Sequence, residues 1–210
     1  MAAAPFLKAG LQSGTILTIA DVLTQLGIEG KSFEQKGGSS SSSSTSPSQS
    51  GSPPAPNAKN TTPTTAVYDP YRTARWTGAG LMIHGPYFFY TFGKIDKLFA
   101  NYTLNLTTVL LKTATAQFTA FPGYLALLFA YMGAAEGMRD PEKIKDNVLK
   151  RVPEAFAAGC VFWPVANTIN FSVVSASYRV PYLASCGSVW GCVLSLINAR
   201  GKREGEAGGK

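Results

Sequence analysis

The sequence predicts an all-α fold: an integral membrane helical bundle of four to five spans with a disordered Ser/Pro-rich loop. Three observations predict it. Charged residues make up only 15% of the chain, against roughly 25% in an average soluble domain. Long stretches contain no charge at all, and they include Gly, Ala, Ser, Thr and amide side chains that let membrane helices pack closely. A block rich in Ser, Pro and Thr interrupts them, and such a composition cannot form a core.

Four charge-free runs are the strongest sign of a membrane protein. They contain 18, 23, 24 and 20 residues. Because a helix needs about 20 mostly apolar residues to cross the hydrocarbon core, each run is long enough or nearly so. One such run could be buried in a soluble domain, but four in 210 residues are hard to bury. The runs cover residues 76–93, 113–135, 155–178 and 180–199.

The runs and their flanks predict five helices in order. The first helix is the weakest span, because Lys8 and Asp21 interrupt it. Arg179 and Pro181 mark the break between the last two helices. The five helices are expected near residues 5–27, 75–98, 110–135, 154–175 and 181–199.

A further short helix is predicted between the third and fourth spans. Asp140 can cap it, and Pro141 suits its first position. Apolar residues recur every four positions beside several lysines, which fits a helix lying in the membrane interface. A solvated linker helix is an equally good interpretation.

The chain therefore divides into four parts. The insertion could host phosphorylation, but a tolerated flexible loop is the simpler interpretation. The parts are a first transmembrane helix at 1–28, a disordered insertion at 29–68, the helical membrane bundle at 69–199 and a polar C-terminal tail at 200–210.

Composition also limits the chemistry. Three cysteines would leave one outside any disulfide framework, and a single histidine does not suggest a His/Cys metal site. We find no nucleophile–base arrangement, so we expect no enzymatic activity and no cofactor. The net charge of +7 is spread over loops and tail, which favours Lys and Arg at a membrane interface over a nucleic-acid footprint. The expected partner is the lipid bilayer, and the sequence leaves open whether the chain forms a homo-oligomer.

Polar residues inside the spans are the candidate functional residues. Spacings of three or four place Trp163, Asn167 and Asn170 on one helical face, and Asp21 and Gln25 are four apart. Because such groups are costly in hydrocarbon, they should face the bundle interior. They either join helices by hydrogen bonds, the somewhat favoured interpretation, or line a narrow hydrophilic path. The full set is Asp21, Gln25, His84, Gln117, Trp163, Pro164, Asn167, Asn170, Arg179 and Trp190.

His84 and three arginines allow separate interpretations. His84 could be an intramembrane proton site, but a hydrogen bond to a neighbouring helix is favoured. The arginines lie at the boundaries of the charge-free runs and should extend to lipid head groups; pairing of one of them with Asp21 is the less favoured alternative. These arginines are Arg72, Arg75 and Arg179.

The C-terminal third carries a recognisable pattern. Its specific positions are Trp163–Pro164, Asn170–Phe171, Val174, Arg179, Trp190 and Leu194–Ser195. At these spacings the chain resembles the Mpv-type family of small integral membrane proteins of peroxisomes and the mitochondrial inner membrane. Weaker matches upstream are Asp69, Arg72, Arg75, Gly80, Gly85–Pro86, Lys112, Gln117, Pro122, Pro5, Gly14, Asp21 and Gln25.

The chain departs from that pattern mainly at polar positions. Asn167 stands where the family usually has Gln, Ser175 replaces a Pro, and Ala116 replaces an Asp beside Gln117. By resemblance the chain is a divergent member of this family, of the fungal type. Any polar path would differ from that of the family.

The resemblance implies a pore-like organellar membrane protein that contributes to small-solute permeability and organelle homeostasis. It favours the mitochondrial inner membrane, with the peroxisomal membrane as the alternative. A membrane scaffold or sorting protein without transport activity is the alternative function, and the Ser-rich insertion would suit it as a docking segment. Conductance of the reconstituted protein would separate the two.

The predicted spans have a direct biochemical test. Detergent should extract the protein from membranes, and alkaline carbonate should leave it in the membrane pellet, because charge-free spans do not dissolve in water. Recovery of most of the protein in the carbonate supernatant would contradict the membrane assignment.

Overall fold

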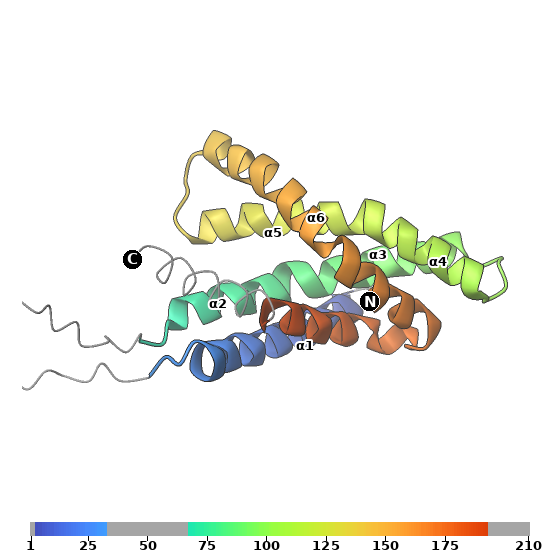
Figure 1. Ribbon diagram of the computed structural model, residues 1–210, viewed down its shortest axis with the longest axis horizontal. Helices are drawn as coiled ribbons and strands as arrows, with labels where there is room; N and C mark the ends of the chain where they lie inside the picture. The colour runs from blue at the N-terminus through green and yellow to red at the C-terminus, as the bar shows by residue number, and fades with distance from the viewer. Residues whose placement is uncertain (1–2, 33–66, 193–210) are drawn as a thin grey trace, which may run out of the picture.

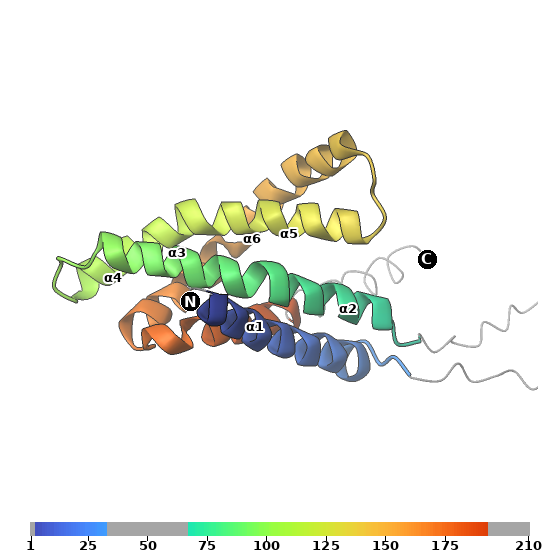
Figure 2. The ribbon, with the colours of Figure 1, turned by 180° about the vertical axis from the view of Figure 1, so that it is seen from behind.

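The computed structural model describes residues 3–32 and 67–192, and these form a bundle of helices (Figures 1 and 2). No strand forms within these two ranges; Ser32 and Val67 make an isolated bridge where the chain enters and leaves the insertion. The all-α prediction is confirmed. The elements are α1 (Ala3–Leu23), η1 (Thr24–Ile28), α2 (Pro70–Ala79), η2 (Gly80–His84), α3 (Gly85–Leu98), α4 (Leu106–Thr115), η3 (Ala116–Ala120), α5 (Phe121–Ala135), α6 (Pro141–Ser172) and η4 (Ala176–Tyr178), followed by a last helix over residues 179–192.

Several elements join into long helical rods. The rods cover 3–28, 70–98, 106–135 and 141–172, and each exceeds the length that a bilayer core requires. Judged by length and hydropathy together, one stretch of the described chain, Leu106–Ala135, qualifies as a membrane span. Most of the predicted insertion, the end of the predicted fifth helix and the tail at 200–210 lie outside the described residues.

The short interfacial helix is not a separate element, so that part of the prediction is wrong. Asp140 does cap a helix, accepting a hydrogen bond from the Glu142 backbone N–H at 3.0 Å, and Pro141 is its first residue. That helix, however, continues through Pro153 and Pro164 as the 32 residues of α6. Figure 1 shows its first half beside α5, at the edge of the bundle. A proline removes one helical hydrogen bond, and packing on α5 and α4 holds the rod together in spite of it.

Two π-helical turns, η2 and η3, are each separated from a following proline by one residue. Pro86 and Pro122 have no N–H to donate, and each proline ring would crowd the carbonyl four residues earlier. The preceding N–H groups, of Gly85 and Phe121, instead bond five residues back, which widens the helix by one residue. The third such turn, η1, lies at the end of the first rod, where the Glu29 N–H bonds Thr24 O.

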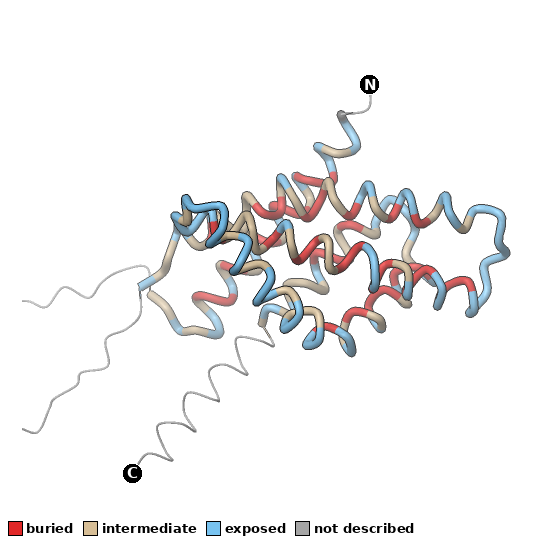
Figure 3. Tube along the Cα trace, turned by 90° about the horizontal axis from the view of Figure 1, so that it is seen from above, coloured by how far each residue is buried: buried red, intermediate tan, exposed pale blue. Residues whose placement is uncertain are grey.

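The bundle buries several polar side chains in its core and exposes many large apolar ones, unlike a typical soluble domain. Polar side chains such as Ser13, Gln25 and His84 are buried, whereas large apolar side chains are exposed along the outer faces of the helices. Figure 3 shows the buried positions along the interior of the bundle. A soluble monomer rarely exposes so much contiguous apolar surface, but a surrounding bilayer covers it. On α6 and just beyond it, exposed apolar residues recur every four positions at Val161, Val165, Ile169 and Val173.

Helix α1 packs backbone to backbone against the antiparallel α2–η2–α3 rod. A Cβ atom added to Gly80 would lie 2.6 Å from the Gly14 Cα, and one added to Gly85 would collide with the backbone of α1. Farther along, the hydroxyl oxygens of Thr18 and Thr77 lie 2.6 Å apart. Small residues thus allow the close approach that stabilises helix pairs in lipid.

The close approach predicts which glycines resist substitution. Gly80→Ala and Gly85→Ala should each lower the free energy of unfolding by about 1–3 kcal/mol, because the added methyl group forces the two backbones apart. Gly93→Ala is the matched control, since a Cβ there meets no atom within 4 Å. Thermal unfolding in detergent micelles measures the difference. Equal melting temperatures for all three variants would contradict the packing argument.

Candidate functional site: a cavity inside the bundle

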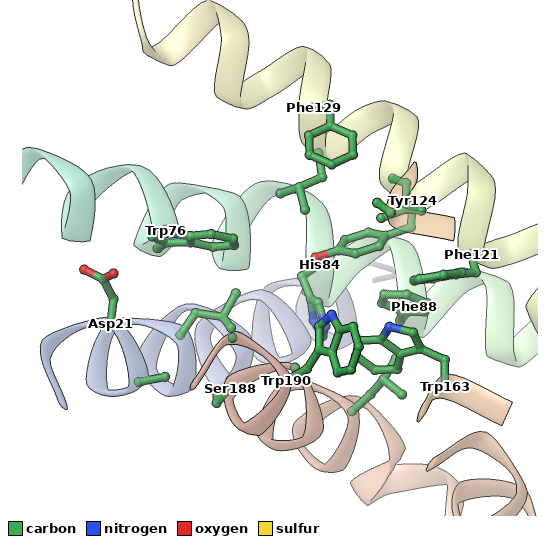
Figure 4. A pocket seen from close by; sticks show the side chains of 18 of the residues that line it. Asp21, Trp76, His84, Phe88, Phe121, Tyr124, Phe129, Trp163, Ser188 and Trp190 are labelled. Atoms are coloured by element: carbon green, nitrogen blue, oxygen red, sulfur yellow. The ribbon is translucent and has the colours of Figure 1, made fainter. Parts of the chain in front are cut away.

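A cavity of ≈ 530 Å³ lies between α1, the α2–η2–α3 rod, the α5–α6 hairpin and the last helix (Figure 4). Its walls are mainly apolar, while charged groups lie at one end and a few polar groups lie along its length. Cavities with apolar walls and a few placed polar groups are the usual form of small-molecule sites. The aromatic wall consists of Trp76, Phe88, Phe92, Phe121, Tyr124, Phe129, Trp163 and Trp190.

A network of charged and polar side chains lies at one end of the cavity. Arg72 Nε lies 2.8 Å from Asp21 Oδ1, and Arg72 Nη1 donates to both carboxylate oxygens of Glu29, at 2.8 and 2.9 Å. Thr73 Oγ1 donates to Asp21 Oδ2 at 2.6 Å, and Gln25 Nε2 donates to the same oxygen at 2.8 Å. Both oxygens of the buried Asp21 carboxylate are therefore partnered, which offsets the cost of burying the charge.

The start of α2 holds this network in place. Asp69 caps α2 by accepting from the Arg72 N–H at 3.0 Å, and Pro70 is the first helical residue. Gln25 Oε1 accepts from the Asp69 N–H at 2.8 Å, which ties η1 to the start of α2. Partial burial alone would raise the pKa of Glu29, but hydrogen bonds from Arg72 and Lys31 outweigh it and hold this pKa below its usual range.

Polar groups in the middle of the cavity come from three helices. His84 Nδ1 lies 3.1 Å from Ser13 Oγ, and the imidazole packs edge-to-face against Tyr124 with ring centres 5.5 Å apart. Asn167 is buried and lines the cavity, and its Oδ1 has no hydrogen-bond partner within the described chain. An unpartnered buried oxygen is costly, so Asn167 offers an acceptor to a donor that enters the cavity.

The opposite end of the cavity is closed. Phe92 is a lining residue, and its ring centre lies 5.3 Å from that of Phe171. The cationic groups of Lys112 and Arg179 lie 5.9 and 5.1 Å from the Phe171 ring centre. Both cations pair with Asp96, and Lys112 Nζ is 2.8 Å from it. This ion cluster joins α3, α4 and the last helix beyond Phe92.

The structure divides the ten predicted residues. Asp21, His84, Trp163, Asn167 and Trp190 line the cavity. Trp163 packs on Phe121 with ring centres 5.6 Å apart, and Trp190 stacks on Phe162 at 5.0 Å. The labelled side chains in Figure 4 show Asp21 at one end, His84 and Trp190 near the centre, and Trp163 toward the other end beside Phe121.

The other five predicted residues lie outside the cavity lining. Gln25 belongs to the network behind Asp21, and Arg179 belongs to the ion cluster at the closed end. Gln117 Nε2 lies 3.8 Å from Cys160 Sγ, and the carbonyl of Pro164 accepts from the Thr168 hydroxyl at 2.8 Å. Asn170 is fully buried, and neither of its amide atoms has a partner within the described chain.

The arginines differ from expectation. Arg72 pairs with Asp21 and Arg179 with Asp96, so neither extends freely to lipid head groups. The pairing of an arginine with Asp21, the less favoured alternative, is what forms. Sequence analysis also missed Thr73 and Asp96, because each acts through a partner on another helix. A signal was present, since Asp96 is the one acidic residue among the cations between the first two charge-free runs.

The described part of the chain offers no cluster of three His, Cys, Asp or Glu side chains that could hold a metal ion. The cavity presents aromatic faces, the Asn167 oxygen and the ion network, groups that suit non-covalent recognition of a ligand.

Comparisons with known proteins extend over nearly the whole chain. Residues 133–195 match the sequence model of the family described as Mpv17 / PMP22. The chain is 25% identical to Protein sym1 of Aspergillus oryzae, over 96% of this chain and 95% of that protein. It is 29% identical to PXMP2/4 family protein 4 of Dictyostelium discoideum, over 63% and 70%. It is 19% identical to the Mitochondrial inner membrane protein Mpv17 of Drosophila melanogaster, over 91% and 95%. No solved structure matches the chain significantly.

The ion network predicts a strong effect of removing Arg72. Arg72→Gln should cost about 3–5 kcal/mol of stability, because it leaves the buried Asp21 carboxylate without its cation. Adding Asp21→Asn should recover part of that loss. Arg75→Gln is the control: its side chain is equally exposed, at 28%, but lies 3.9 Å from Asp69, so the cost should stay below about 1 kcal/mol. Thermal unfolding in detergent measures all three. No recovery in the double variant would refute the pairing.

Proposed function

Because the chain belongs to the Mpv17/PMP22 family of membrane proteins, we propose that it is an integral organelle-membrane protein whose central cavity admits small solutes. The role is pore-like and non-enzymatic, and it contributes to the permeability and homeostasis of the organelle.

We propose the mitochondrial inner membrane as its location. The Drosophila relative carries that location in its name and aligns with 91% of this chain. The peroxisomal membrane is the alternative, because the motifs of the C-terminal third resemble those of peroxisomal proteins as well.

One observation carries the pore-like proposal. The cavity runs inside the bundle from the Asp21–Arg72 network toward Phe92, and the buried Asn167 oxygen in its wall has no hydrogen-bond partner among the described residues. If polar residues served only to join helices, this oxygen would be expected to accept a bond from a neighbouring helix. Its position in the cavity wall supports contact with solute or water instead.

The wall composition favours uncharged solutes. Aromatic and aliphatic side chains form most of the cavity surface between the ion network and Phe92. An ion would lose its hydration there without gaining matching charges, which is costly. A small neutral molecule can instead lie against aromatic faces and donate a hydrogen bond to Asn167.

In this proposal the observed conformation is a closed one. The groups that close it are Phe92, Phe171 and the Asp96 ion cluster. Passage of a solute requires these groups to move, because they fill the bundle at the Phe92 end of the cavity. The cation–π contacts to Phe171 and the ion pairs to Asp96 would then be the interactions that hold the closed state.

Two neighbouring alanines on α6 allow a matched test. Both side chains are exposed, but Ala158 lines the cavity and Ala157 does not. In liposomes containing purified protein, Ala158→Trp should reduce efflux of small neutral solutes several-fold, because the indole narrows the cavity. Ala157→Trp should leave efflux at the wild-type rate, since its side chain faces away.

The outcome separates transport from scaffolding. Efflux equal to that of empty liposomes for the correctly folded wild-type protein would overturn the pore-like proposal and favour the scaffold or sorting function. Efflux reduced equally by both tryptophan variants would show that the cavity is not the route.

A further inference from the structure

A second hollow lies at the other end of the bundle from the Asp21 network. Its volume is ≈ 310 Å³, and it is formed by the N-terminal part of α1, the end of α3 and the start of the last helix. The aromatic residues Phe6, Phe89 and Tyr90 line one part of it. The cations Lys94, Lys97 and Arg179 line another, so the hollow has an apolar and a basic part.

The basic part carries charge that the protein does not neutralise. Asp96 is the acidic residue of the lining, and it already pairs with Lys112 and Arg179. Lys94 and Lys97 are exposed, and neither makes an ion pair within the described chain. Lys94 Nζ instead lies 5.3 Å from the Tyr90 ring centre. The hollow therefore has an excess of positive charge that is available to an anion.

The position of Lys94 and Lys97 along the α2–η2–α3 rod places these two cations at a membrane surface. Residues 76–93 are free of charge, and Lys94 is the next residue. Lysines and tyrosines at such a boundary occupy the head-group level. The apolar part faces the hydrocarbon side: Phe6 packs edge-to-face on Phe89 with ring centres 5.0 Å apart. Basic groups at head-group depth beside an apolar surface match both halves of a phospholipid.

We propose that this hollow binds one anionic phospholipid, with its phosphate group at Lys94 and Lys97 and an acyl chain against Phe6 and Phe89. The inference does not depend on solute passage, because the hollow and the cavity share only Phe92 among their lining residues. Free phosphate would use the lysines alone and leave the apolar part of the hollow unused. The lipid is thus the ligand that fits all of the lining.

The test compares lipid classes and charge-matched variants. Purified protein in a zwitterionic detergent is titrated with phosphatidylglycerol or phosphatidylcholine, and bound lipid is counted by native mass spectrometry. The wild-type protein should prefer phosphatidylglycerol. The variant Lys94→Gln, Lys97→Gln should bind it about 10- to 30-fold more weakly, since each lysine near a lipid surface contributes about fivefold. Lys94→Arg, Lys97→Arg should keep the preference.

The control removes the same charge elsewhere. Lys143 and Lys150 are exposed on the first half of α6 and do not line the hollow. Replacing both with Gln should leave the preference for phosphatidylglycerol unchanged. If this variant lost as much binding as Lys94→Gln, Lys97→Gln, the effect would depend on overall charge alone, and the proposal would be overturned. Competition by millimolar inorganic phosphate would overturn it in favour of a simple anion site. A wild-type protein without preference for phosphatidylglycerol would also refute it, whatever the variants do.

Discussion

The contact between the backbones of α1 and η2 positions the rest of the bundle. Because Gly14 and Gly80 have no side chains to separate them, the two helices are fixed at short distance and in one register. That register brings Ser13 to His84 in the middle of the bundle and Asp21 to the start of α2. The polar end and the centre of the cavity thus both follow from one stretch of small residues. The last helix and the α5–α6 hairpin complete the walls around this fixed pair (Figure 4).

Ions are concentrated at the two ends of the bundle, and aromatic and apolar side chains lie between them. This distribution fits a protein whose middle lies in hydrocarbon, where an ion pair must be fully partnered to be tolerated. The Asp21 carboxylate meets that condition, with both oxygens bonded. Between the ends, polar groups are few, and they differ in kind. His84 has a partner on another helix, whereas Asn167 presents its oxygen to the cavity. Asn170 is buried, has no partner within the described chain and does not line the cavity.

The helix positions could be predicted from the sequence because charge-free length is a local property that the bilayer selects directly. The continuity of α6 could not, since Pro153 normally indicates a helix end and only packing against α4 and α5 keeps the rod intact. Within the site, helical spacing showed that Asn167 and Asn170 share a face. Spacing alone did not show that Asn167 lines the cavity and Asn170 does not, because of two residues three apart one can line a cavity while the other lies outside it. The partners of the arginines depend on the register between helices far apart in sequence, which no local pattern encodes.

The π turns have a consequence for how length variation in this chain should be interpreted. Each turn contains one residue more than a regular helix would, and one residue corresponds to a rotation of about 100°. Loss of a single residue within η2 would leave composition and hydrophobic length nearly unchanged, yet it would rotate all of α3 relative to α2. Phe89 would then leave the side that meets α1. Single-residue insertions and deletions at these turns therefore exchange lipid-facing and interior surfaces, an effect larger than that of most substitutions.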